Sequence, residues 1–117
     1  MLRVVNVTRQ QTVASSAKPA YTLLSRLRGL LGGPPLAAGE GLYLRPCRSI
    51  HMIGMTFPID AIFVDNQTKV VGLVKEIKPW GISDYHWKAV GCLELPSGTI
   101  NATGTMLGDR LQFEELE

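Results

Sequence analysis

Four side chains that can do chemistry lie within an otherwise apolar stretch, residues 47–63. They are Cys47, His51, Met55 and Asp60. Apolar stretches of this kind ordinarily belong to a core, where a polar group needs a hydrogen-bonding partner or a chemical role. A thiol, an imidazole and a carboxylate are the groups used in nucleophilic catalysis, acid–base catalysis and metal binding. A functional site, if the chain has one, is therefore expected in residues 47–63.

A metal site is not favoured by the spacing. If residues 47–55 form a strand, Cys47 and His51 share a face but lie about 13 Å apart, at ~3.3 Å per residue. Zinc ligands lie within ~2.0–2.3 Å of the ion, so this pair needs a bulge or bend to share one. His51, Met52 and Met55 also contain soft ligands for copper(I), but methionines that fill core gaps are the favoured explanation. We predict no metal and no cofactor.

Asp60 interrupts an apolar strand whose two faces both appear covered. A carboxylate there needs a cation or several N–H donors. The available cations are Arg28, Arg26 and His51. A buried pair that fixes the strand register is the favoured interpretation, and a catalytic carboxylate is the alternative.

Glu94 raises the same question, because it lies between Leu93 and Leu95 and shares its face with Cys92. Two carboxylates and one histidine in a cleft would suffice for general acid–base catalysis. The predicted ligand-binding residues are Arg28, His51, Asp60 and Glu94, and no catalytic residue is assigned. Cys47 paired with His51 or His86 is disfavoured as a nucleophile, since no predicted helix N-terminus activates it.

The segment 78–87 places three aromatic side chains, Trp80, Tyr85 and Trp87, in a predicted loop. Exposed aromatic residues in loops make good binding surfaces. They would equally serve to close one end of a barrel. The sequence leaves both alternatives open.

The composition is that of one globular domain, residues 1–117. Hydrophobic residues make up 45% and charged residues 19%. A net charge of +2 gives no case for nucleic-acid binding. No window approaches ~18 consecutive apolar residues, so no membrane span is predicted. The N-terminus does not resemble a signal peptide, so we expect a cytoplasmic location, with Cys47 and Cys92 as thiols.

One helix is predicted over residues 18–31, after an irregular connector at 8–17. Pro19 suits the first helical turn, and the segment 32–35, Gly-Gly-Pro-Pro, ends the helix. The apolar positions recur at helical spacing and predict one buried stripe. They are Ala20, Leu23, Leu24, Leu27, Leu30 and Leu31.

The remaining chain alternates with the period of a strand. Strands are predicted at 2–7, 42–46, 48–55, 58–65, 68–75, 87–95 and 110–115, with a turn at 65–67 and one helical turn within 97–104. The connections are too short for repeated βαβ crossovers. We predict an α+β fold, mostly antiparallel β, with a barrel-like sheet and one short helix of the N-terminal half packed on it.

Several segments in fixed order resemble the bacterial and archaeal family called domain of unknown function 192. They are residues 26–32, 41–44, 49–63, 93–98 and 108–109. The resemblance covers nearly the whole chain and implies a compact, mostly β domain with a short early helix. It implies no established activity, substrate or cofactor.

Together these observations favour a small accessory or binding domain with a polar-lined cleft for a small ligand or a protein partner. One alternative is a small hydrolase or lyase that uses His51 with Asp60 or Glu94 as acid and base. Another is a structural or interaction protein that acts through the aromatic loop 78–87. An enzyme needs titratable groups that converge in an open pocket.

Overall fold

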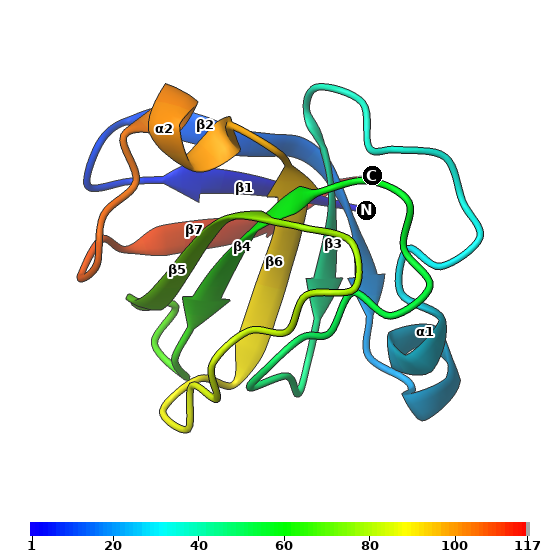
Figure 1. The fold of residues 1–117 in the computed structure, drawn as a ribbon. Helices are drawn as coiled ribbons and strands as arrows, with labels where there is room; N and C mark the ends of the chain where they lie inside the picture. The colour runs from blue at the N-terminus through cyan, green and yellow to red at the C-terminus, as the bar shows by residue number, and fades with distance from the viewer. Residues whose placement is uncertain (117) are drawn as a thin grey trace.

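The computed structural model describes residues 1–116, which form one curled seven-stranded sheet and two short helices (Figure 1). The elements are β1 Leu2–Asn6, β2 Gln11–Ala20, α1 Leu23–Arg28, β3 Glu40–Leu44, β4 Ile59–Val64, β5 Val70–Ile77, β6 Gly91–Pro96, α2 Thr99–Thr103 and β7 Leu111–Glu115. The strand order is β5-β4-β6-β3-β2-β1-β7. Only β2 and β3 pair in parallel within the described residues. The predicted α+β, mostly antiparallel class is confirmed.

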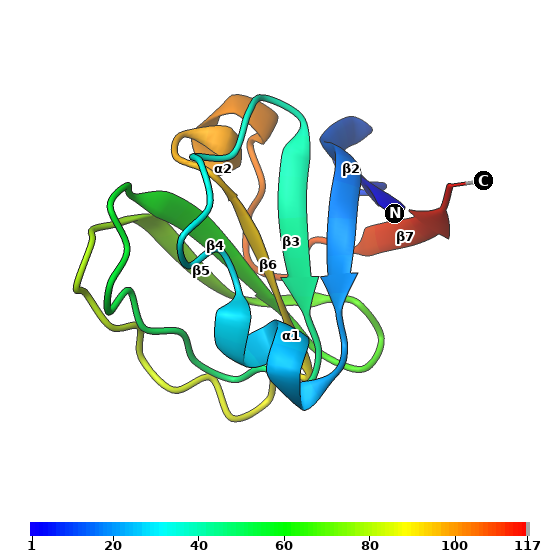
Figure 2. The ribbon, with the colours of Figure 1, turned by 90° about the vertical axis from the view of Figure 1, so that its right-hand side faces the viewer.

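The sheet curls until its two edge strands meet near their starts (Figure 2). The N–H of Val70 donates to the carbonyl of Asp109 at 2.8 Å, and the N–H of Leu111 donates to Thr68 at 2.9 Å. Lys69 and Arg110 form an isolated bridge between the same segments. These bonds satisfy part of the edge that an open sheet would leave unpaired. The barrel-like shape therefore follows from closure at one end.

Strand β4 is buried along its whole length, and its two faces belong to different clusters. Ile62 and Val64 lie in the inner cluster, which joins residues from opposite edges of the sheet, including Val70 and Leu111. Residues 59, 61 and 63 lie in an outer cluster. The prediction that this strand is covered on both sides is confirmed.

The outer cluster is covered by irregular chain. Ile50, Met52 and Met55 pack there against Ile59 and Phe63 of β4. Their backbone is irregular, so the strand predicted at 48–55 is wrong. The segment instead lies beside residues 80–86 and is joined to them by separate backbone hydrogen bonds. His51 makes one bridge, to Ile82.

The predicted helix over 18–31 is also wrong in extent, because residues 11–20 form β2. This strand pairs with β1 on one side and β3 on the other, so long-range pairing overrides a local helical pattern. The irregular connector predicted at 8–17 is wrong for the same reason, since most of it belongs to β2. Helix α1 begins with a capping box between Thr22 and Ser25 and ends at Gly29, whose φ is +50°. Its length is only six residues.

Of the apolar stripe predicted for this helix, the leucines that lie within α1 do not enter the core. Within the described chain, α1 buries no residue, and Leu24 is 79% exposed. Leu30, just after the helix, packs beside Ala20 and Leu42. Neither helix among residues 1–116 is long and apolar enough to cross a membrane.

Candidate functional site

A pocket of about 520 Å³ lies beside α1 and is walled by four parts of the chain. They are residues 23–31, 44–55 and 85–90 and the side chain of Glu94. This volume is in the range of small-ligand sites. Three of the predicted binding residues, Arg28, His51 and Glu94, line the pocket, and Asp60 does not.

The walls are held together by hydrogen bonds between irregular segments. The backbone N–H of Cys47 donates to Val90 at 3.1 Å, and Nε of Arg48 donates to the carbonyl of Ala89 at 3.1 Å. The α1 wall is held more loosely, by one bond of 3.4 Å from Nη1 of Arg26 to the carbonyl of Pro46. The pocket is therefore built on β6 and its flanking loops, and α1 forms a less firmly attached side.

Glu94 presents a buried acid to the pocket. Strand β6 is central in the sheet, so Glu94 is flanked by Leu42 of β3 and Ala61 of β4. Glu94 is only 7% exposed. This burial raises the pKa of its carboxyl group to about 7. No hydrogen bond or charge within residues 1–116 is found to offset that effect. The carboxyl group can therefore hold or release a proton near neutral pH.

Arg26 brings an unsatisfied donor to the same pocket. Its Nε is buried and has no acceptor among residues 1–116. It shares the lining with Arg28, Arg48 and Glu94 but forms no ion pair with Glu94. A buried donor without an acceptor is uncommon and costs free energy. The arrangement suits an incoming acceptor.

Cys47 and Cys92 are both free thiols, and Cys47 lines the pocket. Cys47 is half-buried and lines the pocket, and its Sγ donates to the carbonyl of Ser49 at 3.2 Å. Hydrogen bonding from the Cys92 thiol lowers the pKa of Cys47, and the charge of Arg26 adds to this. Burial raises the pKa of Cys92 well above its ordinary value. The two thiols are thus chemically unequal.

Asp60 lies on the opposite face of the sheet from Glu94. Asp60 pairs with Leu95 and Ala61 pairs with Glu94, so alternation separates the two carboxylates. Asp60 is 1% exposed, and its partners are the backbone N–H groups of Glu76 and Ile100. The sequence left two kinds of partner open for Asp60, a cation or several N–H donors. The structure provides N–H donors. His51, Asp60 and Glu94 therefore do not converge.

Residues 4–113 match the model of the family DUF192, described as Uncharacterized ACR. The chain belongs to the DUF192 family. A UPF0127 protein of Thermococcus sibiricus is 31% identical over 115 residues, which cover 95% of this chain and 74% of the relative. The resemblance noted in the sequence is confirmed.

Two solved structures share the fold of this DUF192 chain at 21% identity and a TM-score of 0.81. One is a protein of unknown function from Novosphingobium aromaticivorans, with 95% of this chain and 82% of that chain covered. The other, from Sinorhizobium meliloti, is named as a candidate transcription regulator, with 96% and 91% covered. At this identity the likeness shows the fold alone.

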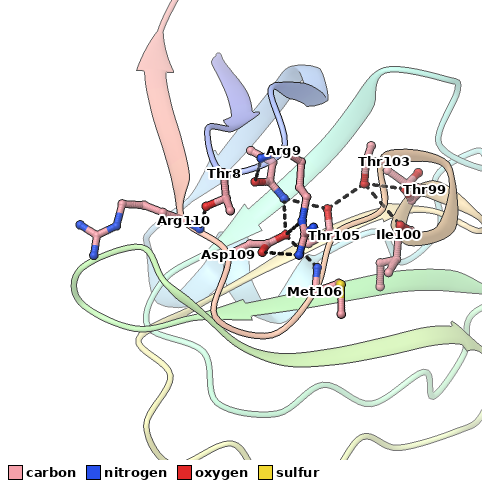
Figure 3. Close-up of polar contacts among 10 residues, drawn as sticks. Thr8, Arg9, Thr99, Ile100, Thr103, Thr105, Met106, Asp109 and Arg110 are labelled. Atoms are coloured by element: carbon pink, nitrogen blue, oxygen red, sulfur yellow. Dashed lines mark hydrogen bonds and ion pairs between the residues drawn. The ribbon is translucent and has the colours of Figure 1, made fainter.

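A second polar cluster in the DUF192 chain includes Arg9, Thr105 and Asp109 (Figure 3). Asp109 accepts hydrogen bonds from Nε of Arg9 and Nδ2 of Asn6, both at 2.9 Å, and from the N–H of Met106 at 2.9 Å. Asn6 Nδ2 also donates to Thr105 at 3.2 Å. These groups satisfy one another, so the cluster is a structural tie between β1 and the turn before β7.

The aromatic loop is exposed and does not close the barrel. Trp80, Tyr85 and Trp87 are each more than 60% exposed, and Tyr85 also lines the pocket.

Among residues 1–116 no three His, Cys, Asp or Glu side chains gather as a metal site. Glu94 was among the predicted binding residues, but Arg26, Cys47 and Cys92 were not. The face that Cys92 shares with Glu94 was the one sequence signal for the thiols.

Proposed function

We propose that the pocket binds a small organic acid with an apolar body. The observation that carries the proposal is the buried Nε of Arg26, which has no acceptor among residues 1–116 and belongs to a side chain that lines a ligand-sized pocket. A carboxylate or similar anion would supply the missing acceptor through a charge-assisted hydrogen bond. Such bonds are stronger than neutral ones and favour a fixed orientation.

The charges around the pocket support an anion. Arg26, Arg28 and Arg48 contribute three positive charges, and Glu94 is the one acidic side chain of the lining. With a pKa of about 7, Glu94 is substantially protonated at neutral pH. In that form it donates a hydrogen bond instead of repelling an anion. The lining is then positive as a whole.

The walls favour an apolar body on the ligand. Leucine, isoleucine and methionine side chains make up much of the lining. They are Leu23, Leu27, Leu30, Leu31, Leu44, Ile50, Met52, Ile53 and Met55. Methionine is flexible and polarisable, so such a wall adapts to ligands of differing shape. The substrate class is therefore an amphiphilic acid rather than a compact inorganic anion.

Other functions have less support. An acid–base enzyme that combines His51 with both Asp60 and Glu94 is disfavoured, because Asp60 bonds to α2 on the face of the sheet opposite Glu94. A protein partner at the aromatic loop remains a weaker candidate, since exposure alone names no partner. Cytoplasmic location also remains part of the proposal, supported by two cysteines that are free thiols.

Calorimetric titration of the reduced protein with three matched probes, octanoate, octanol and octylamine, tests the proposal. We expect octanoate to bind at one site, octanol more weakly, and octylamine not at all. Arg26→Gln should weaken octanoate by roughly 10–150-fold, the equivalent of about 1.5–3 kcal/mol for a hydrogen bond to a charged group.

Two control variants separate the pocket from the surface. Arg3→Gln removes a cation from β1, outside the pocket lining, and should leave octanoate binding unchanged. Leu24→Ser removes an exposed leucine that is not part of the lining and should also change nothing. Octylamine binding as tightly as octanoate, or no octanoate binding at all, would refute the proposal.

A further inference from the structure

We propose that Cys47 and Cys92 form a dithiol pair that undergoes thiol–disulfide exchange with a small disulfide entering the pocket, and that Glu94 accepts the proton of Cys92. This activity is separate from the binding of an organic acid. It requires the pocket as an entry route but neither the Arg26 hydrogen bond nor any bound acid.

The backbone places the two cysteines side by side. In the register of β3 and β6, Leu44 is the partner of Cys92. Three residues beyond Leu44, the N–H of Cys47 donates to the carbonyl of Val90, two residues before Cys92. Cys47 packs against the outer cluster that contains Cys92. The two thiols therefore belong to one packed cluster.

Access separates the two thiols into an attacking and a resolving partner. Cys47 lines the pocket and is half-buried, so a small disulfide can reach it. Cys92 has no exposed surface, so it can react only with a group already attached to Cys47. The lowered pKa of Cys47 favours its thiolate, the form that attacks disulfides.

The exchange is balanced as two displacements on an external disulfide, RSSR. The Cys47 thiolate attacks one sulfur, a Cys47–SR bond forms, the S–S bond breaks and one RS⁻ leaves. Cys92 then loses its proton to Glu94 and attacks Sγ of Cys47, which forms the Cys47–Cys92 bond and releases the second RS⁻. The protein gives up two electrons, and the external disulfide is reduced to two thiols.

Glu94 is placed for the proton transfer. It lies two residues after Cys92 on the same face of β6, and its charge influences both thiols. With a pKa of about 7, it can accept a proton near neutral pH and return it to solvent through the pocket. An ordinary surface carboxylate would be a weaker base.

The test is oxidation of the folded, reduced full chain by oxidised glutathione, followed by intact mass spectrometry and peptide mapping. In the unaltered protein we expect a transient glutathione adduct on Cys47, followed by a species lacking two hydrogen atoms and carrying a Cys47–Cys92 bond. Cys92→Ala should stop at the stable adduct on Cys47. Cys47→Ala should not react at Cys92.

Glu94→Gln tests the base, with Glu114→Gln on β7 as the matched control. The first displacement should be unchanged, and conversion of the adduct to the internal disulfide should slow by more than about tenfold and lose its pH dependence near 7. Quenching the unaltered protein at early times and mapping the adduct removes any dependence on variants that fold poorly.

Three outcomes would overturn the inference: an adduct that never resolves in the unaltered protein, a first adduct on Cys92, or no reaction of either thiol under native conditions. Octanoate titration of the same reduced samples is scored separately. A protein that binds octanoate but forms no internal disulfide refutes this inference and leaves the binding proposal standing.

Discussion

The carboxylate of Asp60 accepts a hydrogen bond of 2.8 Å from the backbone N–H of Ile100, 40 positions later in the chain. Its other oxygen accepts the N–H of Glu76 at 2.9 Å. One side chain thus joins β4 to β5 and to the first turn of α2, where N–H groups lack helical partners. An aspartate in an apolar strand is explained by these two donors.

Asp60→Asn should destabilise the fold by about 1–3 kcal/mol, because an amide nitrogen replaces one accepting oxygen and leaves a backbone N–H facing a donor. Urea denaturation at pH 7 measures the change. Asp65→Asn is the matched control, because both of its hydrogen bonds use Oδ1, which asparagine keeps. Equal midpoints for the two variants would contradict this account.

Glu94 should make the protein less stable as pH rises. Its pKa is about 7 in the folded state, against an ordinary value of 4.5, so the folded state holds the proton more tightly. The free energy of unfolding therefore falls between these two pH values, by up to about 3 kcal/mol from this group. Above pH 7 the loss is complete.

Glu94→Gln should abolish that part of the pH dependence, so its stability relative to the unaltered protein rises between pH 5 and pH 8. Denaturation in urea at both pH values measures it, with Glu114→Gln as control. Parallel pH profiles for the unaltered protein and the Gln variant would show that Glu94 is not protonated as described.

Asp109 should make the protein more stable as pH rises, in contrast to Glu94. Burial tends to raise its pKa, but hydrogen bonds from Arg9, Asn6 and Met106 outweigh this and hold it below the ordinary value. Its contribution to stability is present above that ordinary value and is lost as pH falls through the folded one. Asp109→Asn should lower the free energy of unfolding at neutral pH by about 1–2 kcal/mol, and by less in acid, as urea denaturation measures. An equal effect at both pH values would rule out a charge role.

The leucines of α1 should tolerate polar substitution. Leu24→Ser removes little buried area, because Leu24 is 79% exposed, so the free energy of unfolding should change by less than about 0.5 kcal/mol. Leu93→Ala in the inner cluster should cost about 2–5 kcal/mol. Thermal and urea unfolding measure both. A cost above about 1 kcal/mol for Leu24→Ser would mean that α1 packs its apolar stripe after all.

The local sequence pattern was sufficient to predict strands where elements that follow one another in the chain also pair in the sheet. The alternation over residues 58–65, the turn at 65–67 and the strand that follows were predictable, since β4 and β5 pair through a short connection. The burial of both faces of β4 followed from the apolar residues on both of its faces. The same pattern placed Cys92 and Glu94 on one face of β6.

The β-rich class, the family and the unusual polar residues could therefore be predicted from the amino-acid sequence. Only the tertiary structure showed that residues 11–20 are a strand, because pairing with β1 and β3 orders a segment predicted as irregular chain and the start of a helix. It also decided that Asp60 and Glu94 part to opposite faces, and that Arg26, Cys47 and Glu94 meet at one pocket. Those contacts join distant segments, and no local periodicity records which distant groups a side chain will meet.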